Sequence, residues 1–120
     1  MSALTEEERA FLRSGVRALA RIATVDAKGR PYVVPCGWSW DEAADEIVLG
    51  GREVLRTARV RHVRDTGRVA ISIDGVNTEG GWAPWALLAR GPATVDEAAE
   101  VIRLIPDWTK SWGLSGAKSF

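Results

Sequence analysis

Apolar and polar positions alternate along much of this chain with the two-residue period that is typical of β-strands. Glycine, proline and short acidic clusters separate the apolar runs and mark the turns. The predicted strands are residues 18–25, 32–40, 47–49, 68–74, 82–94 and a run from 101 to 106 that continues toward Trp108 and Trp112. The first two form a predicted β-hairpin. Residues 75–81 are predicted as a loop, and residues 115–120 as a tail.

Two segments have the character of helices. Residues 5–14 form the first, because Thr5 can cap the start and Glu8 can complete a capping box three residues later. The second is residues 52–65. Six strands with one long helix after the third do not fit a doubly wound sheet, whose strands alternate regularly with helices. The pattern predicts a mainly β (α+β) single domain over residues 1–120, a small antiparallel barrel with an inserted helix.

The composition narrows the classes of function. The chain has 120 residues, enough for one domain, and its 16 basic and 16 acidic side chains give a net charge of zero. A dedicated nucleic-acid binder normally has a basic excess. A single cysteine excludes an internal disulfide, the N-terminus lacks the apolar core of a signal peptide, and no apolar run has membrane-spanning length. We therefore expect a cytoplasmic protein with neither nucleic acid nor membrane as a partner.

Residues 50–64 concentrate positive charge in this neutral chain. The stretch holds one acidic side chain, Glu53, against arginines at positions 52, 56, 59, 61 and 64, a local charge of +4. A helix would place Arg52, Arg56 and Arg59 on one face, where like charges cost about 0.2–0.5 kcal/mol per pair. The helix dipole also disfavours cations near the helix start. Taken alone, the charge pattern favours a solvated surface helix in which Glu53 pairs with Arg56.

An external anion is the alternative explanation for this charge. Gly50 and Gly51 precede the predicted helix and permit close approach of a ligand to the backbone. Free N–H groups at a helix start complete an anion site. A phosphate or a carboxylate is therefore a reasonable ligand here.

The chain offers few groups for catalysis of its own. Cys36 is expected to be buried, and the single histidine, His62, to lie on the helix surface. One histidine cannot supply a Cys-His or Ser-His-Asp set, and no cluster of metal ligands accompanies it. We therefore predict no catalytic side chain and no metal site, so an enzyme of this sequence needs a cofactor for the chemistry.

The sequence contains six tryptophans, an unusually large number for 120 residues. They occupy positions 38, 40, 82, 85, 108 and 112. Packing in the core or in a dimer interface is the expected role of most of them, with one or two at a pocket mouth, where tryptophan can stack on a flat ligand.

The order of the motifs resembles the flavin/deazaflavin split-barrel family related to pyridoxamine 5′-phosphate oxidase, and most closely its F420-dependent branch. The stretches that carry the resemblance are residues 19–25 with 29–37, 47–51, 57–64 with 68–70, 90–93 and 111–114. The resemblance implies a six-stranded split β-barrel that works as a homodimer with two cofactor sites at the subunit interface. It also implies that basic residues at the start of the inserted helix hold the cofactor phosphate.

The same resemblance implies the residues of the site. The implied cofactor-binding residues are Val34, Pro35, Cys36, Gly37, Gly50, Gly51, Arg56, Thr57, Arg59, Arg61 and Trp112. The implied substrate-lining residues are Trp38, Trp82 and Trp85. The implied activity is hydride transfer from reduced F420 to a small unsaturated organic substrate. Two alternatives stay open: an FMN-binding protein like pyridoxamine-phosphate oxidase, and a non-catalytic F420 carrier.

Overall fold

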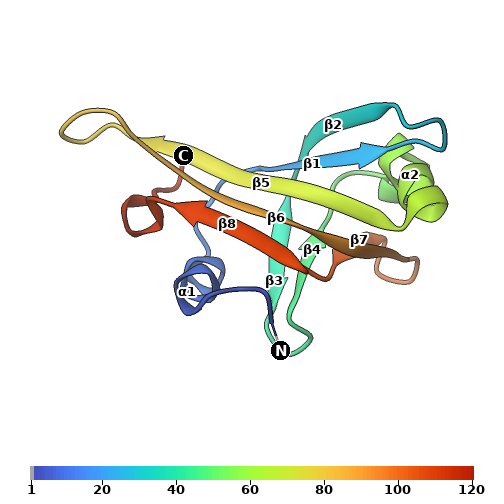
Figure 1. Ribbon diagram of the computed structural model, residues 1–120, viewed down its shortest axis with the longest axis horizontal. Helices are drawn as coiled ribbons and strands as arrows, with labels where there is room; N and C mark the ends of the chain where they lie inside the picture. The colour runs from blue at the N-terminus through green and yellow to red at the C-terminus, as the bar shows by residue number, and fades with distance from the viewer. Residues whose placement is uncertain (1) are drawn as a thin grey trace.

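Eight antiparallel strands form one bent, open sheet in the computed structural model, which describes residues 2–120 (Figure 1). The strands are β1 (Ala20–Val25), β2 (Pro31–Cys36), β3 (Trp38–Asp41), β4 (Glu46–Leu49), β5 (Arg68–Asn77), β6 (Ala83–Asp96), β7 (Val101–Leu104) and β8 (Trp108–Trp112). Their order across the sheet is β2-β1-β5-β6-β7-β4-β3, and β8 pairs with β6 outside this path. The sheet path therefore ends at two strands, β2 and β3, that are consecutive in the chain.

Strand β6 joins the two halves of the sheet. Residues 83–92 pair with β5, and residues 93–96 pair with β7. Gly91 lies where the partner changes, and a Cβ there would overlap the carbonyl oxygen of Ile105. Glycine is therefore needed for the chain between β7 and β8 to cross β6 at this point.

The number of strands differs from the predicted six because two predicted strands are each divided. The segment 32–40 becomes β2 and β3, which separate at Gly37 and pair with β1 and β4 respectively. The last run becomes β7 and β8, separated by a segment with Pro106, which cannot donate a hydrogen bond to a sheet. The predicted loop 75–81 is also shorter, since pairing of β5 with β6 continues to Asn77.

The predicted first helix is confirmed as α1 (Glu6–Ser14). Thr5 Oγ1 accepts from Glu8 N at 3.1 Å, and a Glu8 carboxylate oxygen accepts from Thr5 N at 3.0 Å, so the capping box is complete. The carboxylate of Glu8 also accepts from the hydroxyls of Thr109 and Ser111 at 2.7 and 2.6 Å. These contacts fasten α1 to β8.

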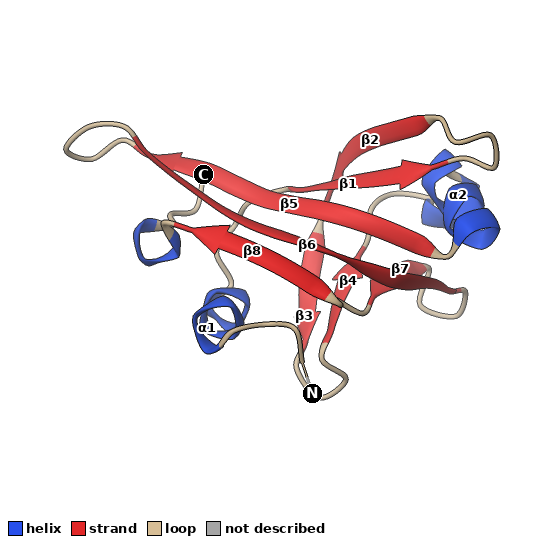
Figure 2. Cartoon of the chain, viewed as in Figure 1, coloured by secondary structure: helices blue, strands red, loops and turns tan. Residues whose placement is uncertain are grey.

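The predicted helix 52–65 is instead a 3₁₀ turn, η1 (Val54–Arg56), followed by α2 (Ala58–Thr66) (Figure 2). Thr57 is extended and caps α2, so the helix cannot run through it. The prediction that Arg52, Arg56 and Arg59 share one helical face is therefore wrong, because the first two precede α2. Separate local conformations remove the like-charge repulsion that a single helix would impose.

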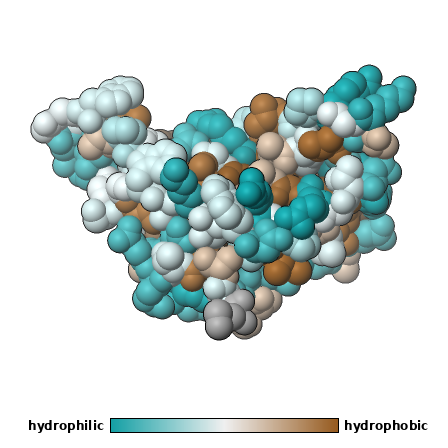
Figure 3. Space-filling view, in the orientation of Figure 1, coloured by the Kyte–Doolittle hydropathy of each residue, from teal (hydrophilic) through white to brown (hydrophobic). Residues whose placement is uncertain are grey.

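The hydrophobic core lies between the two halves of the sheet and under both helices. Its fully buried aliphatic side chains are Ile22, Ile47, Leu49, Ile73, Leu87, Ile102 and Leu104. Phe11 of α1 packs on Trp38 and Trp85, at ring-centroid distances of 6.1 and 5.6 Å. On the face seen in Figure 3, hydrophobic residues also lie among the polar ones at the surface.

The predicted tail folds back on the body of the molecule. A second 3₁₀ turn, η2 (Leu114–Gly116), buries Leu114. The backbone N–H of Phe120 then donates to the carbonyl of Arg17 at 3.0 Å. Within residues 2–120, neither helix has the length and apolar character needed to cross a membrane.

Candidate functional site

A buried arginine without an anionic partner is the most distinctive feature of the molecule. Arg59 lies in the first turn of α2 and is only 7% exposed. Its Nη2 donates to the carbonyl of Gly50 at 3.1 Å, while its Nε has no partner within residues 2–120. No carboxylate of the described chain lies within ion-pair distance of it, whereas eight other arginines and one lysine within residues 2–120 make such pairs. A buried guanidinium is costly unless it is paired.

Two glycines shape the wall against which this guanidinium lies. Gly51 has a φ of +140°, and a Cβ there would lie 2.5 Å from Arg59 Nη2, so only glycine fits. Gly50 donates its N–H to the carbonyl of Gly37 at 3.0 Å, which joins the end of β4 to the bend between β2 and β3. Gly37, Gly50, Gly51 and Arg59, predicted from separate stretches of sequence, are thus brought together.

The start of α2 adds backbone donors to this cradle, by which we mean Gly50, Gly51, Thr57 and Arg59. Thr57 Oγ1 donates to the carbonyl of Val54 at 2.6 Å and accepts from Val60 N at 3.4 Å. The other first-turn N–H groups have no partner within the helix, and the helix dipole makes this end positive. The cradle therefore combines a buried cation with the positive end of a helix, which suits a phosphate or carboxylate.

Cys36 ends β2 beside the cradle and is buried, as predicted. Burial raises the pKa of its thiol, and the positive charge of Arg59 acts in the opposite direction with a smaller effect. The thiol is therefore neutral near pH 7 and lacks the thiolate that a nucleophile requires. His62 is half-buried, with Nδ1 2.8 Å from the hydroxyl of Thr24, rather than freely exposed on the helix.

Four further residues named for the cofactor differ in their exposure. Arg56 is exposed and pairs with Glu53 at 3.6 Å. Arg61 is also exposed and faces the turn between β1 and β2. Along β2, Val34 is half-buried and Pro35 exposed. None of these four side chains makes a hydrogen bond with Arg59.

The tryptophans named for the substrate are dispersed. Trp38 is half-buried and donates its Nε1–H to the carbonyl of Ala18 at 2.8 Å. Trp85 is 2% exposed in the core, which is at odds with a place at a pocket mouth. Trp82, 77% exposed, follows the β5–β6 turn, and Trp112 ends β8. Figure 1 places that turn and α2 at opposite ends of the molecule, so one chain does not bring Trp82 to the cradle.

Sequence reasoning missed a groove next to the cradle. The groove has a volume of about 580 Å³ and lies between the end of α1, strand β3 and Phe120. Gly37, Trp38 and Arg17 are among the residues that line it. The segments that meet here are some hundred residues apart in sequence, and an apolar residue at position 120 was the only local signal of a folded C-terminal segment.

Comparisons with known proteins agree with this architecture. No family model matches the sequence. The chain is 30% identical to the 5a,11a-dehydrotetracycline/5a,11a-dehydrooxytetracycline reductase of Streptomyces rimosus, over 93% of this chain and 84% of that protein. Among solved structures, an F420 reductase superposes with a TM-score of 0.66 at 15% identity, over 89% of this chain and 98% of its own. An FAD-binding protein from Mesorhizobium loti gives a TM-score of 0.66 at 13% identity, over 90% and 92%.

The two structural likenesses concern the fold, whereas the likeness to the reductase extends through nearly the whole sequence. That reductase supports an oxidoreductase activity. The chain belongs to the split β-barrel family of flavin- and deazaflavin-dependent oxidoreductases related to pyridoxamine 5′-phosphate oxidase.

Proposed function

We propose that this protein is an F420-dependent reductase that transfers a hydride from the reduced deazaflavin to an unsaturated organic substrate. The observation that carries the proposal is the buried guanidinium of Arg59, which lacks an anionic partner in residues 2–120 and lies against Gly50 and Gly51. The phosphate of F420 would supply the anion that this arginine lacks. The F420 reductase among the structural neighbours favours this cofactor.

The residues of the cradle fit the phosphate end of such a cofactor. Arg59 and the first N–H groups of α2 would hold the phosphate, while Gly51 allows close approach. The end of β2, Val34 to Gly37, would run beside the ring system. Bound reduced F420 supplies a hydride, and the protein contributes position, orientation and exclusion of water. Because its thiol is neutral, Cys36 would line the cofactor site without taking part in the reaction.

The reductase relative guides the choice of substrate. Its name describes action on 5a,11a-dehydrotetracycline and 5a,11a-dehydrooxytetracycline, and the prefix dehydro denotes a double bond. For this chain we propose only a general class of substrate. It is a flat molecule with a carbon–carbon double bond conjugated to a carbonyl. Such an acceptor takes the hydride at one carbon and a proton from solvent at its neighbour.

A homodimer is part of the proposal. Several apolar side chains at the edge and outer face of the sheet are exposed, among them Val33 (65%), Tyr32 (43%) and Trp108 (38%). A second copy that covers them would also close the cofactor site. Trp82 and Trp112, which lie away from the cradle in their own chain, could then complete the site of the partner.

FMN is the second candidate cofactor, and the FAD-binding structural neighbour favours it. The same cradle would accept the phosphate of FMN, because the cation and the helix start recognise the anion and not the ring. In this case the protein belongs functionally with the flavin enzymes of its family.

A parallel titration with F420 and FMN, each followed by fluorescence, tests the proposal. We expect saturable binding of F420 with a Kd at least about tenfold below that of FMN, a difference of about 1.4 kcal/mol. Reduced F420 should then be oxidised when a conjugated enone is added. Binding of FMN alone would replace the first candidate by the second, and binding of neither would remove both.

A further inference from the structure

We propose that the groove between α1, β3 and Phe120 binds the ring system of the substrate, and that Arg17 selects substrates that carry a negative charge. This proposal adds a substrate site to the proposed function. It rests on the proposed function in one respect, the role of the bound molecule as hydride acceptor. That the groove binds a small molecule is argued from the groove's own residues and does not depend on the proposed function.

The groove adjoins the place where the cofactor ring is expected. Gly37 is one of the residues that line the groove, and its carbonyl accepts the hydrogen bond from Gly50 N at 3.0 Å. Gly50 in turn accepts from Arg59 Nη2. The phosphate cradle, the end of β2 and the groove are therefore contiguous through backbone contacts, as hydride transfer between two bound rings requires.

The walls of the groove are apolar and held in place. Leu12, Val16, Leu19, Trp38, Trp40 and Phe120 provide its apolar side chains. Trp38 is fixed from two sides, by its hydrogen bond to Ala18 and by stacking on Phe11 with an interplanar angle of 19°. Ligand sites typically have volumes of about 300–1,000 Å³ with mostly apolar linings, a description that this groove of about 580 Å³ meets.

One uncompensated charge remains at the rim. Arg13 and Glu42 also line the groove, but they neutralise each other in an ion pair of 2.6 Å. The guanidinium of Arg17 has neither an ion pair nor a hydrogen bond within residues 2–120, while its backbone N–H donates to Ser119 Oγ at 2.8 Å. The backbone of Arg17 is thus anchored and its charge is free. An anionic group on a flat apolar molecule, such as a carboxylate or an ionised acidic hydroxyl, fits this arrangement.

A pair of matched small molecules tests the proposal without any cofactor. Naphthalene-2-carboxylate and its neutral analogue naphthalene-2-carboxamide are titrated into ¹⁵N-labelled protein, and two-dimensional amide and indole spectra map where each binds. We expect shifts concentrated at residues 12–19, 37–42 and 120, which contain the residues that line the groove. We also expect the carboxylate to bind about threefold to fivefold more tightly than the carboxamide, because a single partly exposed ion pair contributes a small binding free energy.

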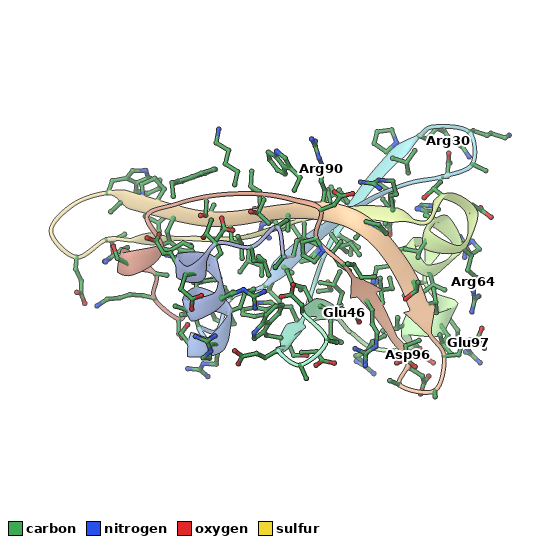
Figure 4. All side chains as sticks on the ribbon, turned by 60° about the horizontal axis from the view of Figure 1, so that its bottom comes forward. Arg30, Glu46, Arg64, Arg90, Asp96 and Glu97 are labelled. Atoms are coloured by element: carbon green, nitrogen blue, oxygen red, sulfur yellow. The ribbon has the colours of Figure 1, made fainter. Side chains whose placement is uncertain are left out.

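Two variants and a control assign the binding to the groove. Arg17→Gln should abolish the preference for the carboxylate, and Phe120→Ala should weaken both molecules to a similar extent. The control Arg64→Gln removes an equal charge from the outer side of α2, where Arg64 pairs with Glu97 at 2.8 Å (Figure 4), and should leave both affinities unchanged.

Shifts concentrated away from residues 12–19, 37–42 and 120, or a preference for the carboxylate that survives in Arg17→Gln, would overturn the proposal. Because no cofactor is present, a failure of F420 to bind leaves this result intact. The two proposals can therefore fail separately.

Discussion

Single residues decide the chemistry of the cradle. Arg59 follows Thr57 by two positions, and the cap at Thr57 turns its side chain inward while Arg56 and Arg61 stay exposed. A buried cation of this kind needs an anion or a dipole to offset its loss of hydration. Here the carbonyl of Gly50 supplies only a partial compensation, which is the physical reason to expect an anionic ligand.

A pair of glycine variants tests the role of the backbone at this site. Gly51→Ala should cost about 1–3 kcal/mol of stability, because its positive φ and the contact with Arg59 leave no room for a Cβ. It should also weaken F420 binding at least about tenfold, a loss of about 1.4 kcal/mol. Gly116→Ala is the control, since Gly116 lies outside the cradle in η2 and a Cβ there would meet only Asn77 Nδ2, at an ordinary contact distance of 3.5 Å. Urea unfolding and F420 titration of both variants measure the effects, and equal behaviour of the two would contradict them.

At the scale of elements, charge pairs attach α1 to the β3–β4 hairpin. Arg9 pairs with Asp45 at 2.7 Å, and Arg13 pairs with Glu42 at 2.6 Å. With the Glu8 contacts to β8, these pairs hold α1 across the end of the sheet and so form one wall of the groove. The position of the wall depends on carboxylates, and therefore on pH.

The hydrogen bond from Arg13 lowers the pKa of Glu42 below its ordinary value of 4.5. As the pH falls, the unfolded chain takes up the proton first, so the contribution of Glu42 to stability is present above about pH 5 and lost below it. Urea midpoints at pH 7, 4 and 3 should therefore fall less steeply in Glu42→Gln than in the natural sequence. The control Glu7→Gln should follow the natural sequence, and parallel curves for all three proteins would contradict the prediction.

The elements also show what the sequence could predict. The capping box of α1 and the hairpin of β1 and β2 are set by neighbouring residues, so local patterns were sufficient. The divisions at Gly37 and Thr57 depend on which strand or surface the next segment meets, information that lies far away in the chain. The arginines and glycines were sufficient to predict an anion site, which stays a prediction. The sequence alone could not distinguish the single buried arginine from its exposed neighbours, because its burial depends on the packing around α2.

At the scale of the whole molecule, one face of the sheet has features that suit the proposed dimer. Ala23, Ala70 and Arg90 lie side by side on β1, β5 and β6. They border a hollow of about 350 Å³ on the outer face, next to Trp108, whose ring lies 4.4 Å from the guanidinium carbon of Arg90. Small residues at its floor allow a second copy to approach closely.

The dimer can be tested on this face. Light scattering after size exclusion should give twice the chain mass of 13.0 kDa for the natural sequence. Ala70→Arg should yield the monomer and also weaken F420 binding, whereas Ala99→Arg, at an exposed turn, should change neither. A natural protein that is monomeric at every concentration, or a monomeric Ala70→Arg that binds F420 normally, would contradict the placement of the cofactor between two copies.

The most direct measurement compares F420 with its phosphate-free riboside in the natural protein and in Arg59→Met, with Arg61→Met as the control on the same helix. If Arg59 holds the phosphate, the natural protein and Arg61→Met should bind F420 about 10- to 100-fold more tightly than the riboside, as expected for charge-assisted hydrogen bonds to a buried arginine. Arg59→Met should bind the two molecules equally. A preference for F420 that persists undiminished in Arg59→Met would contradict the account, because the buried guanidinium would then have no part in holding the anion.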